Sequence, residues 1–280
     1  MKEYNSRILK AKQAIKQADY IIIGAGSGLS TAAGLLYNGE KFEKDFKEFI
    51  EKYHFDNLYS ASFYEFKTQE EKWAFFAKMI KLNRYNKNPL KLYQELYEIV
   101  KNKEYFVLST NVDGQFYNSG FAKEKVFEVQ GDYEYLQCEN ACHNKLYNNE
   151  KLVKKWIRNI KNCKIPSNLV MKCPVCGGNM DMNLRKDANF VQDENWHKAS
   201  NNYNKFLDRI KNKNVVLLEI GVGFNTPGII RFPFEQMTAN NEQITLIRIN
   251  KDYPLPMLEI KSKTISFDED TNKIIEDLKE

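Results

Sequence analysis

The stretch that decides the fold is Ala18-Asp-Tyr-Ile-Ile-Ile-Gly-Ala-Gly-Ser-Gly-Leu-Ser-Thr-Ala-Ala-Gly34, near the start of a chain of 280 residues. Its β-branched and aromatic run, residues 20–23, predicts a buried strand. Three glycines follow at once, and residues 29–34 favour a helix. A strand, a glycine turn and a helix start can bind a dinucleotide, because glycine lets the backbone approach a pyrophosphate and the helix start offers free N–H groups. The alternative is a turn that only joins a strand to a helix.

Length and charge exclude several classes of protein. A chain of this size can form one large domain, or a large domain with an insertion. Its 42 Lys and Arg side chains nearly balance 37 Asp and Glu, for a net charge of +5, which favours a solvated surface over nucleic-acid binding. The polar N-terminal residues 1–17 are unlike a signal peptide, and no apolar run reaches the ~20 residues of a membrane helix. We therefore expect a cytoplasmic protein with no membrane partner.

Polar residues follow a second predicted strand, residues 105–108. A helical insert of about residues 36–101 precedes this strand, and its aromatic residues at helical spacing are expected to be core. The strand leads into Ser109-Thr-Asn-Val-Asp-Gly114. Ligands of open parallel sheets lie beyond the carboxyl ends of the strands, so Asn111 and Asp113 are candidates for chemistry. The alternative is a turn in which the Asp113 side chain bonds to the backbone near Gly114.

Three later strands complete the pattern. Residues 126–129 predict a strand that ends at Gln130-Gly131, and residues 215–220 predict one that ends in the glycine turn Gly221–Pro227. This turn is expected to hold the other end of a dinucleotide. Residues 244–249 predict a further strand, after which the Asn250 side chain is expected to meet an adenosine ribose.

Two short-spaced cysteine pairs predict a structural zinc site. Cys138 and Cys142 are followed about 30 residues later by Cys173-Pro-Val-Cys176, and four thiolates can hold one tetrahedral ion with no open position for catalysis. The neighbouring His143 is expected to replace one ligand or to lie nearby, and Cys163 is left over. The basic, Asn-rich segment between the pairs suggests a surface loop. The alternative is a zinc-free lobe held by apolar contacts.

The ordered set of motifs resembles the sirtuin (Sir2) family. The match comprises the Gly26-Ser-Gly28 loop with Ser30 and Gly34, Thr110-Asn-Val-Asp-Gly114, Gln130-Gly131, the cysteine pairs, Gly221-Val-Gly223 and Asn250. The resemblance implies an α/β fold with a Rossmann-like parallel sheet that binds NAD, made by residues 1–131 and 189–280 and including the helical insert. It also implies a small zinc-ribbon-like lobe, residues 132–188. Enzymes of this family cleave nicotinamide from NAD and pass the ADP-ribosyl group to an acceptor.

The same resemblance implies a set of site residues. Asn111, Asp113 and Gln130 would be catalytic, with Gln130 bonded to the ribose hydroxyls. Ser27 and Ser30 would help the glycine loop to hold the phosphates. The full cofactor site would comprise Ala25, Gly26, Ser27, Gly28, Ser30, Thr31, Gly34, Thr110, Asn111, Asp113, Gln130, Gly221, Val222, Gly223, Asn225 and Asn250.

The chain departs from a typical sirtuin at two places. The usual Gly-Ile-Pro-Asp-Phe-Arg segment is replaced by Gly34-Leu-Leu-Tyr-Asn-Gly39, which has neither the Asp nor the Arg. The general-base histidine of a His-Gly pair is replaced by Gln130. Glutamine takes no proton near neutral pH, so ordinary deacylation is expected to be weak or absent.

These departures, with Glu219-Ile-Gly-Val-Gly-Phe-Asn-Thr-Pro227, resemble the macrodomain-linked class M sirtuins of microbes. That resemblance implies a protein mono-ADP-ribosyltransferase that modifies a lipoylated carrier protein of the glycine-cleavage H type, with a macrodomain hydrolase that removes the mark. Two alternatives remain: an NAD-dependent lysine deacylase that tolerates Gln130, and a non-catalytic NAD sensor. A hydride-transferring dehydrogenase is disfavoured, because the region about 20 residues past the glycine loop offers no acidic ribose-binding residue on a second strand.

Overall fold

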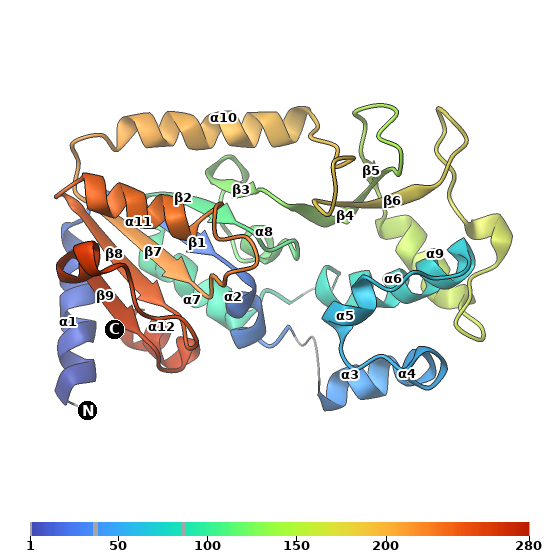
Figure 1. Ribbon diagram of the computed structural model, residues 1–280, viewed down its shortest axis with the longest axis horizontal. Helices are drawn as coiled ribbons and strands as arrows, with labels where there is room; N and C mark the ends of the chain where they lie inside the picture. The colour runs from blue at the N-terminus through green and yellow to red at the C-terminus, as the bar shows by residue number, and fades with distance from the viewer. Residues whose placement is uncertain (1, 36–38, 86–87, 280) are drawn as a thin grey trace. The chain divides into compact units, whose positions relative to one another are not determined.

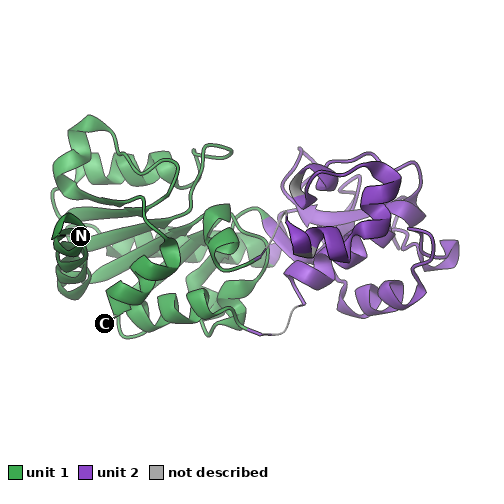
Figure 2. Ribbon diagram, turned by 90° about the horizontal axis from the view of Figure 1, so that it is seen from below, with its two compact units in different colours: residues 1–34, 89–130, 195–280 green, residues 35–88, 131–194 purple. Residues whose placement is uncertain are grey.

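The computed structural model describes residues 2–35, 39–85 and 88–279 (Figure 1). The chain forms two compact units, coloured separately in Figure 2. Unit 1 comprises Met1–Gly34, Pro89–Gln130 and Asn195–Glu280, and unit 2 comprises Leu35–Asn88 and Gly131–Glu194. Each unit is therefore built from separate parts of the sequence.

Unit 1 contains a six-stranded parallel sheet in the order β3-β2-β1-β7-β8-β9. The central strand β1 pairs in parallel with both neighbours, so Ile21 lies opposite Tyr105 on one side and Val216 on the other. The predicted α/β parallel sheet is confirmed. Its strands are β1 (Tyr20–Ala25), β2 (Glu104–Ser109), β3 (Val126–Glu128), β7 (Val215–Ile220), β8 (Ile244–Ile249) and β9 (Thr264–Phe267).

Helices cover both faces of this sheet. Alternate residues of β1 separate the two cores: Ile21 and Ile23 belong to one apolar cluster and Ile22 to the other. The first cluster includes residues of α1 (Lys2–Gln17), α7 (Lys91–Val100) and α12 (Thr271–Lys279), and the second those of α10 (Glu194–Arg209) and α11 (Arg231–Asn240). Burial on both faces explains why the strands are continuously apolar. The remaining helical segments are α2 (Ser27–Ala32), α8 (Gln115–Asn118), η1 (Lys123–Lys125) and η3 (Leu258–Lys263).

Unit 2 combines a small antiparallel sheet with helices. The sheet has the order β5-β4-β6, and the helices carry an aromatic core in which the rings of Phe46, Phe49 and Phe75 contact one another. Its elements are α3 (Glu40–Asp45), α4 (Lys47–Tyr53), α5 (Leu58–Ser62), α6 (Gln69–Asn83), β4 (Gly131–Cys138), β5 (Tyr147–Asn148), α9 (Glu150–Asn159), η2 (Ser167–Leu169) and β6 (Met180–Leu184).

The units divide the chain differently from the domains expected from the sequence. Helices α3 to α6 of the expected insert belong with the cysteine-bearing sheet, because Trp73 of α6 stacks on Trp156 of α9 at 4.9 Å between ring centroids. Helix α7, the last part of the insert, belongs to unit 1, where Leu92 and Leu96 enter its core. Residues 36–38, at the expected start of the insert, lie outside the described residues.

The basic segment between the cysteine pairs, expected to be a surface loop, contains a ten-residue helix flanked by loop residues. Residues 150–159 form α9, whose Val153 and Trp156 are buried. The signal for this helix was present in the sequence, since apolar residues recur at positions 153, 156, 157 and 160. Among the helices in the described part of the chain, none is long and apolar enough to span a membrane.

Candidate active site and metal centre

The glycine loop after β1 packs directly against the loop after β7. The Gly26 N–H donates to the Ile220 carbonyl, and the Gly28 N–H donates to the Gly221 carbonyl, both at 3.0 Å. A Cβ on Gly26 would lie 2.5 Å from the Gly221 oxygen, and one on Gly28 would lie 2.6 Å from the Gly221 Cα. These glycines are thus required by contact between the two loops, a reason that the sequence did not reveal.

A buried polar network follows the ends of β1 and β2. The Ser30 hydroxyl donates to Asp113 Oδ2 at 2.6 Å and lies 3.0 Å from the Tyr93 hydroxyl. Asn111 Nδ2 lies 3.4 Å from the same Tyr93 oxygen. Asp113 Oδ1 accepts from the Gln115 N–H at 3.0 Å, so the turn considered from the sequence forms as well. The structure brings together Ser30, Asn111 and Asp113, all predicted site residues.

Tyr93 is the member of this network that sequence reasoning missed. It lies on α7 and is fully buried, and its hydroxyl links a residue after β1 with a residue after β2. An isolated Tyr in an amphipathic helix carries no signal of such a contact, because its partners lie 63 and 18 residues away in sequence.

Thr110 joins the ends of the two strands. Its N–H and its hydroxyl both donate to the Ala25 carbonyl, at 3.0 and 3.2 Å. Of the other predicted residues of the first loop, Ser27, Thr31 and Gly34 are exposed. The Thr31 hydroxyl donates to the Ser27 carbonyl within α2.

Gln130 follows β3, the strand next to β2, and is half-buried. The backbone before it is fixed, because the Val129 N–H donates to the Ser109 carbonyl at 3.0 Å and the Val129 carbonyl accepts from Trp196 Nε1 at 3.1 Å. Gln130 and Asn111 therefore follow adjacent strands at the same edge of the sheet.

Asn250 links the loops that follow β7 and β8. Its Nδ2 donates to the Val222 carbonyl at 2.7 Å, and its Oδ1 accepts from the N–H groups of Asp252 and Tyr253 at 3.1 and 3.0 Å. The side chain thus has a structural task, and its contact with a ribose stays a prediction. The remaining predicted residues of the β7 loop are the half-buried Gly223 and the exposed Asn225.

A buried ion cluster that the sequence did not reveal lies at the ends of β7 and β8, next to these loops. Glu219 and Arg248 are register partners on β7 and β8, both fully buried, and Arg248 donates to both Glu219 oxygens at 2.7 and 2.9 Å. Arg248 also donates to Glu235 at 2.8 Å, and an Arg231 nitrogen lies 3.6 Å from Glu219. Burial raises the pKa of Glu219, against the lowering effect of Arg248. Burial also disfavours the charged form of Arg231, and it therefore lowers the pKa of that side chain.

This cluster supports both loops at once. Arg231 donates to the carbonyls of Tyr253 and Leu255, at 3.2 and 3.1 Å, and Arg248 also donates to Leu255 at 3.1 Å. The Arg231 guanidinium lies over the Phe224 ring at 4.6 Å, and Phe224 contacts Tyr253. Two buried arginines therefore hold the loop of Asn250 against the loop of Gly221–Pro227.

Unit 2 carries the predicted metal centre. The sulfurs of Cys138, Cys142, Cys173 and Cys176 all lie within 4.8 Å of one another, with 3.6 Å between Cys138 and Cys176 and between Cys142 and Cys173. A tetrahedral zinc with Zn–S bonds of about 2.3 Å separates its sulfurs by roughly 3.8 Å. The four residues therefore fit a structural zinc ion.

His143 lies beside this group and does not replace a cysteine in it. Its Nδ1 is 3.0 Å from Cys142 Sγ, and its Nε2 is 2.9 Å from the Tyr147 hydroxyl. A ring held at both nitrogens in this way can orient a ligand thiolate from outside the coordination sphere.

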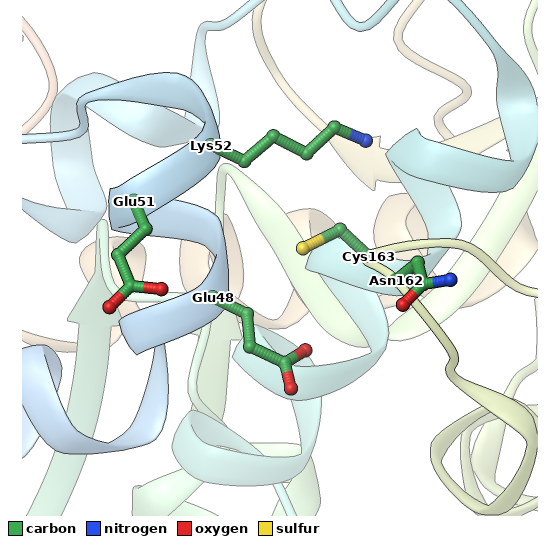
Figure 3. A pocket seen from close by; sticks show the side chains of 5 residues that line it. All are labelled: Glu48, Glu51, Lys52, Asn162 and Cys163. Atoms are coloured by element: carbon green, nitrogen blue, oxygen red, sulfur yellow. The ribbon is translucent and has the colours of Figure 1, made fainter.

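Cys163 lies apart, at a cavity of about 440 Å³ in unit 2 that Glu48, Glu51, Lys52 and Asn162 also line (Figure 3). Burial raises the pKa of the Cys163 thiol. The Lys52 ammonium donates to Glu71 at 3.0 Å. None of the predicted site residues lines this cavity.

Comparison with known proteins identifies the family. No family model matches the chain. It is 35% identical over 266 residues to a protein ADP-ribosyltransferase of Staphylococcus aureus, covering 94% of this chain and 84% of that protein. It is 31% identical over 252 residues to a probable bifunctional ADP-ribose hydrolase/ADP-ribosyltransferase of Fusarium oxysporum f. sp. cubense, covering 85% of this chain and 41% of that protein.

Solved structures agree on the fold. A Sir2 homologue in complex with NAD aligns with a TM-score of 0.60 at 15% identity, covering 96% of this chain and 91% of that chain. A point mutant of a Sir2 homologue in complex with ADP-ribose aligns with a TM-score of 0.59 at 13% identity, covering 96% of this chain and 94% of that chain. By its sequence relatives and its Sir2 fold, the chain belongs to the family of sirtuin-type protein ADP-ribosyltransferases.

Proposed function

We propose that this chain transfers ADP-ribose from NAD to a lipoylated carrier protein of the glycine-cleavage H type and releases nicotinamide. The transferase activity and the use of NAD follow from the family. The observation that carries the proposal is the 35% identity to the S. aureus protein ADP-ribosyltransferase over 94% of the chain. The identity of the carrier is supported by the class M resemblance of Glu219–Pro227 and of Gln130.

The polar network supplies the residues that the reaction needs. NAD contributes the ADP-ribosyl group and the glycosidic bond that breaks. Cleavage of such a bond develops positive charge on the ribose, so positioning and electrostatics count for more than a strong base. Asn111, held beside the Tyr93 hydroxyl, orients the nicotinamide ribose. Asp113, fixed by Ser30 and the Gln115 N–H, holds the same end by accepting an amide N–H.

Gln130 decides between transfer and deacylation. Its carboxamide can bond to ribose hydroxyls but takes no proton near neutral pH. A carboxylate or amine acceptor on the target protein needs little help from a base, whereas deacylation needs a base to activate a ribose hydroxyl. The proposed chemistry is therefore ADP-ribosyl transfer with little or no deacylase activity.

A hydrolase is the proposed functional partner. The name of the Fusarium relative combines an ADP-ribose hydrolase with an ADP-ribosyltransferase, which supports a paired enzyme that removes the modification. We place the reaction in the cytoplasm, where cysteines stay reduced and available for zinc, and it involves neither nucleic acid nor a membrane.

The proposal is tested by intact-mass spectrometry of a lipoylated H-type carrier incubated with this protein and NAD. We expect an added ADP-ribosyl mass on the carrier and an equal amount of released nicotinamide. The matched control is the same carrier without lipoate. An unmodified carrier, with its lipoylation verified, would contradict the proposed acceptor, and O-acyl-ADP-ribose formed from an acyl-lysine peptide would favour the deacylase.

A variant tests the assigned machinery. Asn111→Ala removes the carboxamide that we assign to the nicotinamide ribose, and nicotinamide release in the same assay should fall by at least about 100-fold, a size typical for loss of one preorganised polar group. Undiminished release would remove Asn111 from the mechanism. NAD binding without nicotinamide release by the unsubstituted chain would favour the sensor.

A further inference from the structure

Helix α9 of unit 2 has two contrasting faces. Its apolar face carries Val153 and Trp156, both buried. The Trp156 ring stacks on Trp73 of α6, and its Nε1 donates to the Leu169 carbonyl at 2.9 Å. These contacts fix the orientation of the helix within unit 2, so the opposite face is held toward solvent.

The exposed face of α9 is cationic and continues into the following segment. Between residues 150 and 180 the sequence has a single carboxylate, Glu150. Residues 150–172 carry a net charge of +6, from seven cations and that one carboxylate, whereas the whole chain carries only +5. The other residues of the chain together therefore sum to a net charge of −1. The exposed cations are Lys151, Lys154, Lys155, Arg158, Lys161, Lys164 and Lys172, which we call the α9 cationic face.

Few of these charges are neutralised within the protein. Lys154 pairs with Glu150 at 2.5 Å, and Lys164 lies 3.6 Å from Glu71. Among the described residues, no ion pair within 4.0 Å involves Lys151, Lys155 or Arg158. Like charges three and four residues apart on a helix repel each other, and Lys151, Lys155 and Arg158 have this spacing. The helix keeps a repulsive surface that an anionic partner would relieve.

The chemistry favours an acidic protein over a nucleic acid. Proteins that bind single strands interleave their cations with exposed aromatic rings on which bases stack, but Trp156, the aromatic ring of α9, is fully buried beneath the cations. The family to which the chain belongs is named for action on proteins. Charge complementarity therefore points to a protein with an acidic surface.

We propose that the α9 cationic face is the docking surface for an acidic surface of the acceptor protein. This inference rests on the proposed function, in which the acceptor is a carrier protein. Opposite charges on two surfaces chiefly accelerate association and make it sensitive to salt. The affinity for the acceptor should therefore weaken steeply as ionic strength rises, while nicotinamide release in the absence of acceptor stays constant.

The test compares two triple charge reversals in the full chain. The first, Lys151→Glu with Lys155→Glu and Arg158→Glu, takes the net charge of residues 150–172 from +6 to zero. The second, Lys2→Glu with Lys10→Glu and Lys16→Glu, changes the net charge equally on the exposed side of α1. For each protein, the KM for the lipoylated H-type carrier is measured from about 20 to about 300 mM salt, a range that spans weak and strong screening. Direct binding of the carrier is followed by fluorescence polarisation.

We expect the α9 variant to raise the KM for the carrier at least about tenfold at low salt and to lose its salt dependence, as charge steering predicts. The α1 variant should behave like the unsubstituted chain. All three should unfold at similar temperatures and release nicotinamide equally without carrier. A neutralised variant with glutamine at the three α9 positions should show an intermediate KM, which guards against misfolding of the reversed one.

The outcomes separate the two proposals. Equal KM values for the α9 variant and the unsubstituted chain, with transfer intact, would overturn the docking surface alone. Absence of both transfer and binding with the unsubstituted chain would overturn the carrier and this inference together. Tighter binding of the face to a single-stranded oligonucleotide than to the carrier would assign it to nucleic acid and also overturn the inference.

Discussion

At the scale of single residues, the Tyr93 hydroxyl is the least expected part of the candidate site. It contacts Ser30 and Asn111, which follow different strands. Because its contacts are with these two side chains, we treat it as a positioning residue. Its contribution can be separated from packing because Tyr→Phe removes only the hydroxyl.

Tyr93→Phe should slow nicotinamide release about tenfold, since losing a buried hydrogen bond costs about 1–1.5 kcal/mol. The effect should fall on kcat more than on the KM for NAD, because the contact orients Asn111 and does not bind the cofactor. Steady-state kinetics measure the split. Tyr97→Phe, on the same helix, is the matched control and should be silent. A change in thermal stability with unaltered kcat would mean that the hydroxyl only supports the fold.

The loop glycines allow a second test at this scale. A Cβ at Gly28 would lie 2.6 Å from the Gly221 Cα, whereas a Cβ at Gly223 meets no atom within 4 Å. Gly28→Ala should therefore destabilise the protein by about 1–3 kcal/mol and weaken NAD binding, and Gly223→Ala should leave its stability nearly unchanged. Thermal unfolding with and without NAD gives both readings. Equal losses of stability in the two variants would contradict the conclusion that contact between the two loops requires glycine at position 28.

At the scale of elements, the sequence predicted the features that depend on residues close together in the chain. The strand, the glycine turn and the polar residues after each strand could be identified because each is encoded in a few consecutive residues. The cysteine cluster was also predicted, since short spacings limit where the thiols can lie. Tyr93 and the pair of Glu219 with Arg248 were not, because they interact across separations of 63 and 29 residues.

The ion cluster offers a prediction at this scale. Arg248→Leu removes both hydrogen bonds of the buried Glu219 and leaves it only the Arg231 nitrogen 3.6 Å away, which should cost about 3–5 kcal/mol of unfolding free energy. Arg248→Leu with Glu219→Leu removes this pair of charges and should recover part of the loss, since Glu235 still lacks its Arg248 partner. Urea unfolding of the single and double variants measures the difference. A double variant as unstable as the single one would mean that packing, and not charge, makes Arg248 necessary.

The sign of the pH dependence follows from the pKa of Glu219. Burial raises this pKa in the folded chain, and loss of Arg248 raises it further because only the weaker lowering effect of Arg231 remains. The pKa of a Glu side chain in the unfolded chain is about 4.3. When the folded-state pKa is higher, the full stabilisation is present below the unfolded pKa. That stabilisation is lost as pH rises through the folded-state pKa. The deficit of Arg248→Leu relative to the unsubstituted chain should therefore shrink on acidification and be largest near neutral pH.

At the scale of the whole molecule, the two units depend on different sources of stability. Unit 1 has two apolar cores on the faces of one sheet. Unit 2 has an aromatic helical core and a three-stranded sheet whose strands β4 and β6 meet near the cysteines. Because all four clustered cysteines belong to unit 2, metal loss should affect that unit first.

Cys176→Ser should lower the bound zinc from one ion per chain and produce a separate unfolding transition of unit 2 at lower temperature, since structural zinc contributes folding free energy directly. Cys163→Ser is the matched control: this thiol is also in unit 2 but outside the cluster, so zinc content should be retained. Elemental analysis and calorimetry with and without a chelator provide the two measurements.

NAD binding, which we assign to residues of unit 1 alone, should survive in Cys176→Ser, because removing the metal leaves the glycine loops and the polar network untouched. Loss of zinc in both variants would contradict the assignment of the metal to the four clustered cysteines. Loss of NAD binding together with zinc would contradict the assignment of NAD binding to unit 1 alone.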